Sequence, residues 1–341
     1  MARRLLCAAA YRPSGGNPGP SFDEDAFTIA ATALERTSPQ RRAEPSPLSL
    51  ALVGEVPASL DWAWPVLLGG PVHLQRSAAS ASGLSEALRT AAGGSEGPAL
   101  VVATGSLLAK TTPGELPTVA VAFRFDGPKG PGSEVRLEPA DGAGSLVEAA
   151  IGLFRAHSAG DPGSQWVGDW AELARTAAAE SAESPAESST DRVSQGAYVP
   201  RARYLENLPS RWRFTAERCG ACAGVTFPAR GKCRSCGRTE GLTAVDLPHD
   251  EALVVATTVI GAGGQPTEFD PQVERRGPYE VVLAELAPGA RVTLQVTDST
   301  PGEVRIGDRV DSRLRRLYAM DGEWRYGRKA VPRPGSGAGP R

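Results

Sequence analysis

Four of the five cysteines of the chain lie within one short stretch, CGACAGVTFPARGKCRSC (219–236). Cys219 and Cys222 form one CxxC pair, and Cys233 and Cys236 form a second pair after a spacer of ten residues. A tetrahedral zinc ion takes four thiolate ligands, and each CxxC turn supplies two of them. Because four cysteines leave no coordination position open for a substrate, the pattern predicts a structural Zn²⁺ site rather than a catalytic one.

A second set of residues that could do chemistry is basic and lies near the C-terminus. From residue 301 onward, ten Lys and Arg stand against five Asp and Glu. Such an excess can bind phosphate groups of any kind, including those of coenzyme A, and it can equally be the solvated face of a strand. The candidates for contact with the phosphates of coenzyme A are Arg315, Arg316, Arg328 and Lys329.

Composition limits what these residues can belong to. The chain has 341 residues, room for two or three domains, and its net charge of −2 argues against polyanion binding by charge alone. No apolar run reaches the roughly 18 residues of a membrane span, and the run from Leu5 to Ala10 is too short for a signal peptide. We therefore expect a cytoplasmic protein without a membrane partner, whose paired cysteines hold metal rather than disulfides. The remaining cysteine, Cys7, is expected to be a small buried hydrophobe.

Strand and helix signals alternate in the first part of the chain. Short apolar runs predict strands, and amphipathic segments with helical periodicity predict the helices between them. The predicted strands are 5–11, 48–56, 72–75, 99–105 and 118–127, and the predicted helices are 22–37, 82–94, 144–160 and 166–180. This interleaving predicts an α/β domain with a largely buried sheet over residues 1–160.

The rest of the chain has a different character. A helix followed by a Ser-, Ala- and Glu-rich segment occupies 161–196, and this composition predicts a flexible linker. A short leading helix and the cysteine cluster fill 197–240, the predicted zinc ribbon. Five β-type runs follow in 241–332 and predict an all-β barrel, with a flexible tail at 333–341. The expected fold is therefore multidomain, with an α/β part, a ribbon and a barrel.

Six motifs of the C-terminal part occur together in unbroken order. They are YLENLPSRWRF, RCGACAGVTFPARGKCRSCG, VVATTVIG, PYEVVLAEL, VRIGDRV and RLRRLYAMDGEWRYGRKAVP. With these motifs the segment 198–332 resembles an acyl-CoA-associated family that joins a rubredoxin-like zinc ribbon to an OB-fold. That family occurs beside thiolases and archaeal-type hydroxymethylglutaryl-CoA synthases. The resemblance covers about 40 % of the chain.

This resemblance implies that the ribbon and barrel of this chain have a non-catalytic role. In the family, the ribbon and barrel carry no catalytic residues, and they hold thiolase-fold enzymes together and help to line the path of the acyl-CoA. The expected partner is therefore a thiolase-fold enzyme that supplies the catalytic cysteine, in a hetero-oligomer that handles acyl-CoA. The zinc ion would be structural.

The N-terminal part also resembles these enzymes. Its order of strands and helices resembles one half of a thiolase-type fold, in which a nucleophilic cysteine lies in a C-x-S-G context at the start of a central helix. Here that context reads Ser80-Ala81-Ser82-Gly83, so serine stands where the cysteine would be. We expect a degenerate thiolase-like domain with no catalytic residue and with Ser80 as a vestigial nucleophile position.

Three functions follow from these patterns. The leading one is a non-catalytic accessory subunit of a thiolase-superfamily complex for acyl transfer or condensation. The second is an acyltransferase that uses Ser80; it needs a base, and none of the three histidines, His73, His157 and His249, lies in a glycine-flanked motif typical of thiolase bases. The third, a single-stranded nucleic-acid binder, is disfavoured because the aromatic residues do not form a stacking series along one strand.

Overall fold

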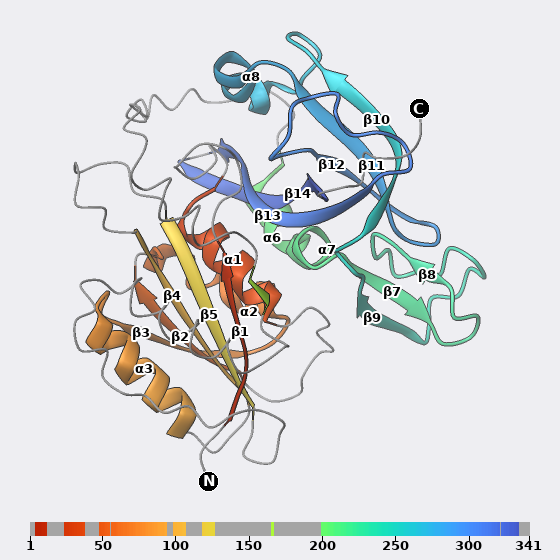
Figure 1. Cartoon of the computed structure of the whole chain (residues 1–341). Helices are drawn as coiled ribbons and strands as arrows, with labels where there is room; N and C mark the ends of the chain where they lie inside the picture. The colour runs from red at the N-terminus through yellow and green to blue at the C-terminus, as the bar shows by residue number, and fades with distance from the viewer. Residues whose placement is uncertain are drawn as a thin grey trace. The chain divides into compact units, whose positions relative to one another are not determined.

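A computed structural model of the chain divides into two compact units, Met1–Glu187 and Ser188–Arg341 (Figure 1). The structure describes residues 4–11, 24–37, 48–54, 56–93, 98–106, 118–126, 165–166, 199–320 and 322–333. The division between the units falls inside the segment predicted as a linker, 161–196, most of which lies outside the described residues. The domain boundaries drawn from the sequence stay predictions.

The first unit is built on a mixed sheet. Its strands follow one another in the order β3-β2-β4-β5-β1-β6. Strand β2 is parallel to β3 and β4, whereas β5 is antiparallel to both β4 and β1, and β6 is parallel to β1. The strands are β1 (Arg4–Tyr11), β2 (Leu48–Gly54), β3 (Val72–Ser77), β4 (Ala99–Ser106), β5 (Thr118–Asp126) and β6 (Gln165–Trp166).

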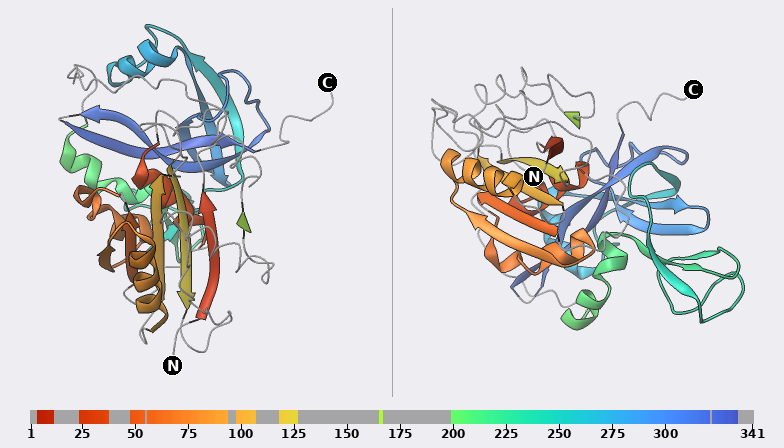
Figure 2. Two further views of the ribbon diagram at one scale, coloured as in Figure 1. Left: turned by 60° about the vertical axis from the view of Figure 1, so that its left-hand side comes forward. Right: turned by 90° about the horizontal axis from the view of Figure 1, so that it is seen from below.

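Helices cover both faces of this sheet (Figure 2). They are α1 (Ala26–Arg36), η1 (Ala58–Leu60), α2 (Ala63–Leu68) and α3 (Ala81–Gly93). The crossover β1-α1-β2 and the crossover β3-α3-β4 run in opposite directions across the sheet, so right-handed connections place α1 and α3 on opposite faces. Helix α2 shares the face of α1, where the rings of Phe27 and Trp64 meet edge to face at 5.0 Å.

The start of α1 is fixed by a reciprocal cap. The side chain of Asp25 accepts a hydrogen bond from the amide of Thr28 at 2.9 Å, and the hydroxyl of Thr28 accepts one from the amide of Asp25 at 2.9 Å. The two bonds satisfy amide groups that the first turn of a helix leaves open. The acidic run before this helix thus supplies its cap.

Most predicted elements of the first unit are present, and two differ. Helix α2 was not predicted, because its six residues are too few to show helical periodicity and contain Pro65. Trp166 was predicted to begin a helix but lies in β6, where its backbone pairs with Ala10 of β1. The rest of that predicted helix, and the one at 144–160, lie outside the described residues.

The second unit contains a five-stranded sheet that curls into a barrel. The strand order is β12-β11-β10-β13-β14, and a parallel bridge between Val296 and Ala330 joins its two edges. The neighbouring pairs in the sheet are antiparallel. The strands are β10 (Ala252–Ile260), β11 (Tyr279–Ala287), β12 (Ala290–Gln295), β13 (Arg309–Met320) and β14 (Glu323–Pro332). The five predicted β runs are thus confirmed as strands.

Two short helices lie in the connection between β10 and β11, namely η2 (Thr267–Phe269) and α8 (Asp270–Arg276). Neither was predicted, since each is shorter than two turns. They are held by contacts with the barrel: the ring of Phe269 lies 5.8 Å from that of Tyr279 and 5.6 Å from that of Tyr318. Among the helices that the structure describes, none has both the length and the apolar character needed to cross a membrane.

A buried carboxylate ties the long loop before β13 to the barrel. Glu280 on β11 accepts hydrogen bonds from the hydroxyl of Thr257 at 2.5 Å and from the amides of Gly302 at 2.9 Å and Val304 at 3.4 Å. Three donors offset the cost of burying the charge. The loop is therefore fixed against β10 and β11.

The leading helices α6 (Arg201–Glu206) and α7 (Leu208–Trp212) dock on one residue of β14. The phenol of Tyr204 donates a hydrogen bond to the carbonyl of Tyr326 at 3.0 Å and accepts one from the amide of Tyr326 at 2.9 Å. The indole of Trp212 donates a second bond to the same carbonyl at 3.0 Å. Burial is the largest cause that raises the pKa of Tyr204 to about 12, so the phenol stays protonated and can donate.

We predict that Tyr204→Phe lowers the free energy of unfolding of the second unit by about 1–3 kcal/mol, because the buried amide of Tyr326 loses its acceptor. Urea unfolding followed by tryptophan fluorescence measures the loss. The control is Arg203→Gln on the same helix, an exposed position where we expect a change below about 0.5 kcal/mol. An effect of Tyr204→Phe no larger than that of the control would contradict the prediction.

Candidate metal centre

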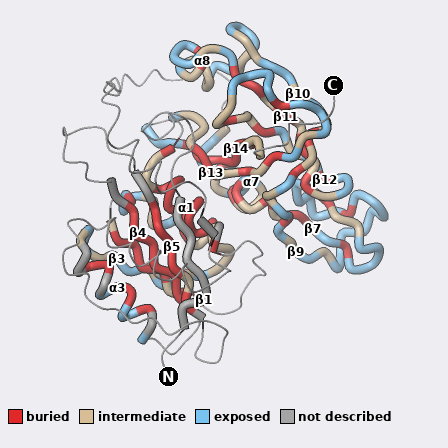
Figure 3. Tube along the Cα trace, in the orientation of Figure 1, coloured by how far each residue is buried: buried red, intermediate tan, exposed pale blue. Residues whose placement is uncertain are grey.

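The cysteine cluster lies in a small three-stranded sheet. Its strands are β7 (Thr215–Cys219), β8 (Val225–Thr226) and β9 (Leu242–Asp246), in the antiparallel order β8-β7-β9. Strand β7 ends at Cys219, so the first CxxC turn begins where the sheet pairing stops. In Figure 3 the loops of this ribbon are largely exposed, while Cys219 and Cys233 themselves are buried.

The two CxxC turns are built by the same backbone hydrogen bonds. The amide of Ala223 donates to the carbonyl of Cys219 at 2.9 Å, and the amide of Gly237 donates to the carbonyl of Cys233 at 2.9 Å. Both donors have left-handed backbone angles, with φ of 58° at Ala223 and 77° at Gly237. Each turn therefore ends on a residue in the conformation that glycine adopts most easily.

The four sulfur atoms fit one metal ion. The ligand atoms of Cys219, Cys222, Cys233 and Cys236 all lie within 4.8 Å of one another. The Sγ atoms of Cys219 and Cys236 are 3.7 Å apart, and those of Cys222 and Cys233 are 3.6 Å apart. A zinc tetrathiolate with bonds of about 2.3 Å has sulfur–sulfur edges of about 3.8 Å. The cluster thus has the donor set and the dimensions for a metal such as zinc.

Backbone amides favour the thiolate form at two of these ligands. The amide of Cys236, the largest cause, lowers the pKa of Cys233 to about 6, and that of Ser235 adds to the effect although burial opposes it. The amides of Cys222 and Ala221 likewise lower the pKa of Cys219. Metal ions bind the thiolate, so these amides prepare the site for a cation.

Ser80, the predicted vestigial nucleophile position, immediately precedes α3 in the first unit. Its hydroxyl accepts a hydrogen bond from the amide of Gly83 at 3.1 Å, which is the geometry of an N-cap. A Cβ atom on Gly83 would lie 2.2 Å from the carbonyl oxygen of Ala78, so only glycine fits there. The presence of serine at position 80 is therefore explained by capping of α3, and that of glycine at position 83 by the close approach of Ala78.

The four candidates for phosphate contact lie on β13 and β14, and three of them are buried. Arg315 is 0 % exposed and pairs with Asp298 at 3.2 Å. Arg328 donates to the carbonyls of Trp212 and Ser312. Lys329 is 1 % exposed, and Arg316, which is partly exposed, lies over the ring of Trp324 at 4.5 Å. A role for these four in phosphate binding stays a prediction.

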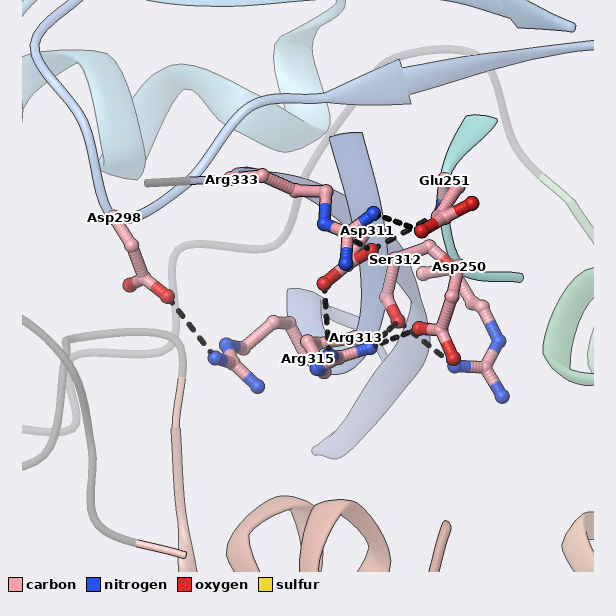
Figure 4. Close-up of polar contacts among 9 residues, drawn as sticks. Asp250, Glu251, Asp298, Asp311, Ser312, Arg313, Arg315 and Arg333 are labelled. Carbon is pink, nitrogen blue, oxygen red and sulfur yellow. Dashed lines mark hydrogen bonds and ion pairs between the residues drawn. The ribbon is translucent and has the colours of Figure 1, made fainter. Parts of the chain in front are cut away.

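A separate network of ion pairs is centred on Arg313, two residues before Arg315 on β13 (Figure 4). Arg313 donates to Asp250 at 2.7 Å and to Asp311 at 3.2 Å, and Arg333 pairs with Glu251. The hydrogen bond and charge of Arg313 hold the pKa of Asp250 below its usual range, although burial, the largest single cause, acts to raise it. The basic excess seen in the sequence is thus partly balanced by acids from distant parts of the chain.

The C-terminal part of the chain is similar in sequence to known proteins. No family model matches the chain. A DUF35 domain-containing scaffold protein of Methanothermobacter thermautotrophicus is 32 % identical over 133 residues, which are 38 % of this chain and 95 % of that protein. The chain belongs to the DUF35 scaffold-protein family. This membership rests on the C-terminal part, and it confirms the sequence-based expectation of an accessory-protein family there.

A second DUF35 domain-containing scaffold protein, from Methanocaldococcus jannaschii, is 31 % identical over 132 residues, which are 38 % of this chain and 89 % of that protein. A solved chain described as "Ltp2-ChsH2(DUF35) aldolase" aligns with 40 % of this chain and 98 % of its own length. Its sequence identity is 23 % and the TM-score is 0.30, too low to support a comparison of folds. Both curated DUF35 relatives match little more than a third of this chain.

We predict that the purified protein holds one metal ion per chain, and that Cys222→Ser or prolonged chelation removes it. Because a structural metal contributes directly to folding, loss of the metal should lower the melting temperature and speed amide exchange in β7 and β9. Elemental analysis and hydrogen exchange measure the two effects. Glu240→Gln, an exposed change in the same ribbon, is the control. Unchanged exchange in the metal-free protein would contradict a structural role.

We also predict that Ala223→Gly raises the free energy of unfolding by up to about 1 kcal/mol, since it relieves a left-handed alanine. Ala221→Gly is the matched control, because Ala221 lies in the same turn without a positive φ, and this change should give no gain. Chemical unfolding of the metal-loaded proteins compares them. A gain for Ala221→Gly equal to that for Ala223→Gly would refute the explanation.

Proposed function

We propose that this chain is a non-catalytic accessory or scaffold subunit of a thiolase-superfamily complex, hydroxymethylglutaryl-CoA synthase-like or ketosynthase-like, that performs acyl transfer or condensation. The observation that carries the proposal is the match to DUF35 scaffold proteins over nearly their whole length. A scaffold needs surfaces for partners rather than a reactive centre, and the described cysteine cluster has the closed ligand set of a structural site.

The first unit supports a thiolase-like contribution. Its sheet is mixed, with helices on both faces, and α3 begins at the Ser80 motif. A thiol nucleophile is absent from that position in the sequence, and a serine with an N-cap role stands there instead. In the proposal, this unit keeps the architecture of half a thiolase fold and has lost its chemistry, while the partner provides the catalytic cysteine.

The second unit supports a rubredoxin-like ribbon joined to an OB-fold. Strands β10 to β14 form a five-stranded antiparallel sheet whose edges β12 and β14 meet in parallel, which makes a small closed barrel. The metal in the ribbon is proposed to be Zn²⁺ with a structural role. Contact of the barrel with an acyl-CoA bound at the partner is part of the proposal.

The decisive experiment is affinity purification of the tagged full-length chain from its native host, with partners identified by mass spectrometry. The expected result is a thiolase-fold enzyme that carries an intact catalytic cysteine and that turns over acyl-CoA in the purified complex. Recovery of nucleic acid, or of copies of this chain alone, would contradict the accessory role.

Two variants of Ser80 separate the accessory role from the acyltransferase alternative. Ser80→Ala removes the cap of α3 and should cost about 0.5–2 kcal/mol of stability. Ser80→Asn keeps an oxygen that can cap the helix but has no hydroxyl to acylate. We expect the complex with Ser80→Asn to retain both stability and activity. Full stability with lost activity in Ser80→Asn would instead assign the chemistry to Ser80.

A further inference from the structure

Arg325 on β14 is a buried cation in which two of the three guanidinium nitrogens have no hydrogen-bond partner. Its residue exposure is 2 %, and its Nη1 donates to Glu323 at 2.9 Å. Its Nε and Nη2 are buried and have no hydrogen-bond partner. These two nitrogens point their N–H groups in the same direction, and together they form the edge of a guanidinium that grips a carboxylate or a phosphate with two parallel bonds.

The remaining contact of Arg325 does not satisfy this edge. The guanidinium carbon lies over the Tyr204 ring, 5.0 Å from its centre, so this contact is a cation–π contact and supplies no oxygen acceptor for Nε and Nη2. Buried charged donors without acceptors are costly. The site therefore gains from any oxygen acceptor that can reach it.

The charges around Arg325 favour an anion. Glu323 is shared with Arg201 at 2.9 Å, so its charge is already divided between two cations. Arg211 on α7 is exposed and precedes Trp212, whose indole binds the carbonyl of Tyr326, the residue after Arg325. Both Arg211 and Arg325 act to lower the pKa of Tyr204. Neither an ion pair nor a hydrogen bond from the Arg211 side chain is present among the described residues.

Tyr318 lies beside Arg325 in the sheet. It pairs directly with Arg325 across β13 and β14 and is partly exposed. Burial raises the pKa of Tyr318, while Arg211 and Arg325 act to lower it. Glu268 on η2 acts to raise that pKa, so one acid also lies near this ring. Three guanidinium groups thus stand against the two carboxylates of Glu323 and Glu268.

We propose that the Nε and Nη2 edge of Arg325 binds an oxyanion, a carboxylate or a phosphate, with Arg211 as the second cation and Tyr318 beside it. The proposal rests on the second unit alone and does not depend on the proposed function. In a complex, the anion has two sources: an acidic side chain of a partner protein, or a phosphate group of a bound small molecule. The bidentate chemistry is the same for both.

A bridging water is the competing explanation. The Oε2 atom of Glu268 is also buried without a hydrogen-bond partner. An ordered water between Glu268 and Arg325 would satisfy both groups and leave no site for an anion. The two explanations differ in their response to added anions and to Glu268→Gln, which keeps the shape of the side chain and removes its charge.

The test is a titration of the full-length, metal-loaded protein with sodium phosphate and, separately, with sodium acetate, each against sodium chloride of equal ionic strength. Melting temperature and isothermal calorimetry report binding. We expect a saturable rise in melting temperature with at least one of the two anions and none with chloride. Glu268→Gln should strengthen the binding because it removes a nearby negative charge.

Two variants test the assignment to Arg325. Arg325→Lys keeps the charge but loses the bidentate edge, and it should weaken binding about tenfold or more. Arg211→Gln changes an exposed residue, so it tests the site even if the first variant folds poorly, and it should also weaken binding. Arg305→Gln, exposed on the same barrel, is the control and should bind as the parent protein does.

The two anions distinguish the source. Saturation by phosphate alone would assign the site to a phosphate group, and saturation by acetate would assign it to a carboxylate of a partner. The proposal is overturned if neither anion gives a saturable effect, or if both Arg325→Lys and Arg211→Gln bind as the control does. Loss of stability in Glu268→Gln together with no anion effect would establish the bridging water instead.

Discussion

The second unit depends on how the backbone amide and carbonyl of a single residue of β14 are used. The amide and carbonyl of Tyr326 both turn toward the leading helices, where Tyr204 and Trp212 bind them. Helix α7 leads within three residues to β7, so the same contact sets the position of the first strand of the ribbon. Phe214, between them, is buried in the core of the barrel. Helices, barrel and metal site are thus joined through one short segment.

The sequence was most informative where function depends on local spacing. The two CxxC pairs identify the candidate metal site, because each turn closes within four residues, and the alternating runs of the barrel identify its strands. Short helices such as α2 and α8 escaped prediction because they are held by packing against the rest of their units rather than by their own periodicity. The Ser80 motif was recognised, but its roles as cap and close contact appear only in three dimensions.

Charge was the property that the linear sequence described least well. The basic excess of the last forty residues suggested a surface, yet Arg315 and Arg328 lie inside, bound to Asp298 and to backbone carbonyls. Trp212 lies at the end of α7, Ser312 on the neighbouring strand β13 and Asp298 between β12 and β13, so composition could not reveal these partners. Arg325 shows the converse: a residue that looked ordinary in the sequence has buried donors that no neighbour uses.

The ribbon leaves and re-enters the rest of the second unit at one point. The amide of Leu247 donates to the carbonyl of Phe214 at 3.3 Å, and Thr215 pairs with Asp246, so its two ends lie side by side. The ribbon, from Thr215 to Asp246, is therefore an insertion whose first and last residues are paired with each other. A tight turn could span the distance between these two ends. Such a module can change in length or be exchanged in evolution while the barrel and the paired helices keep their places.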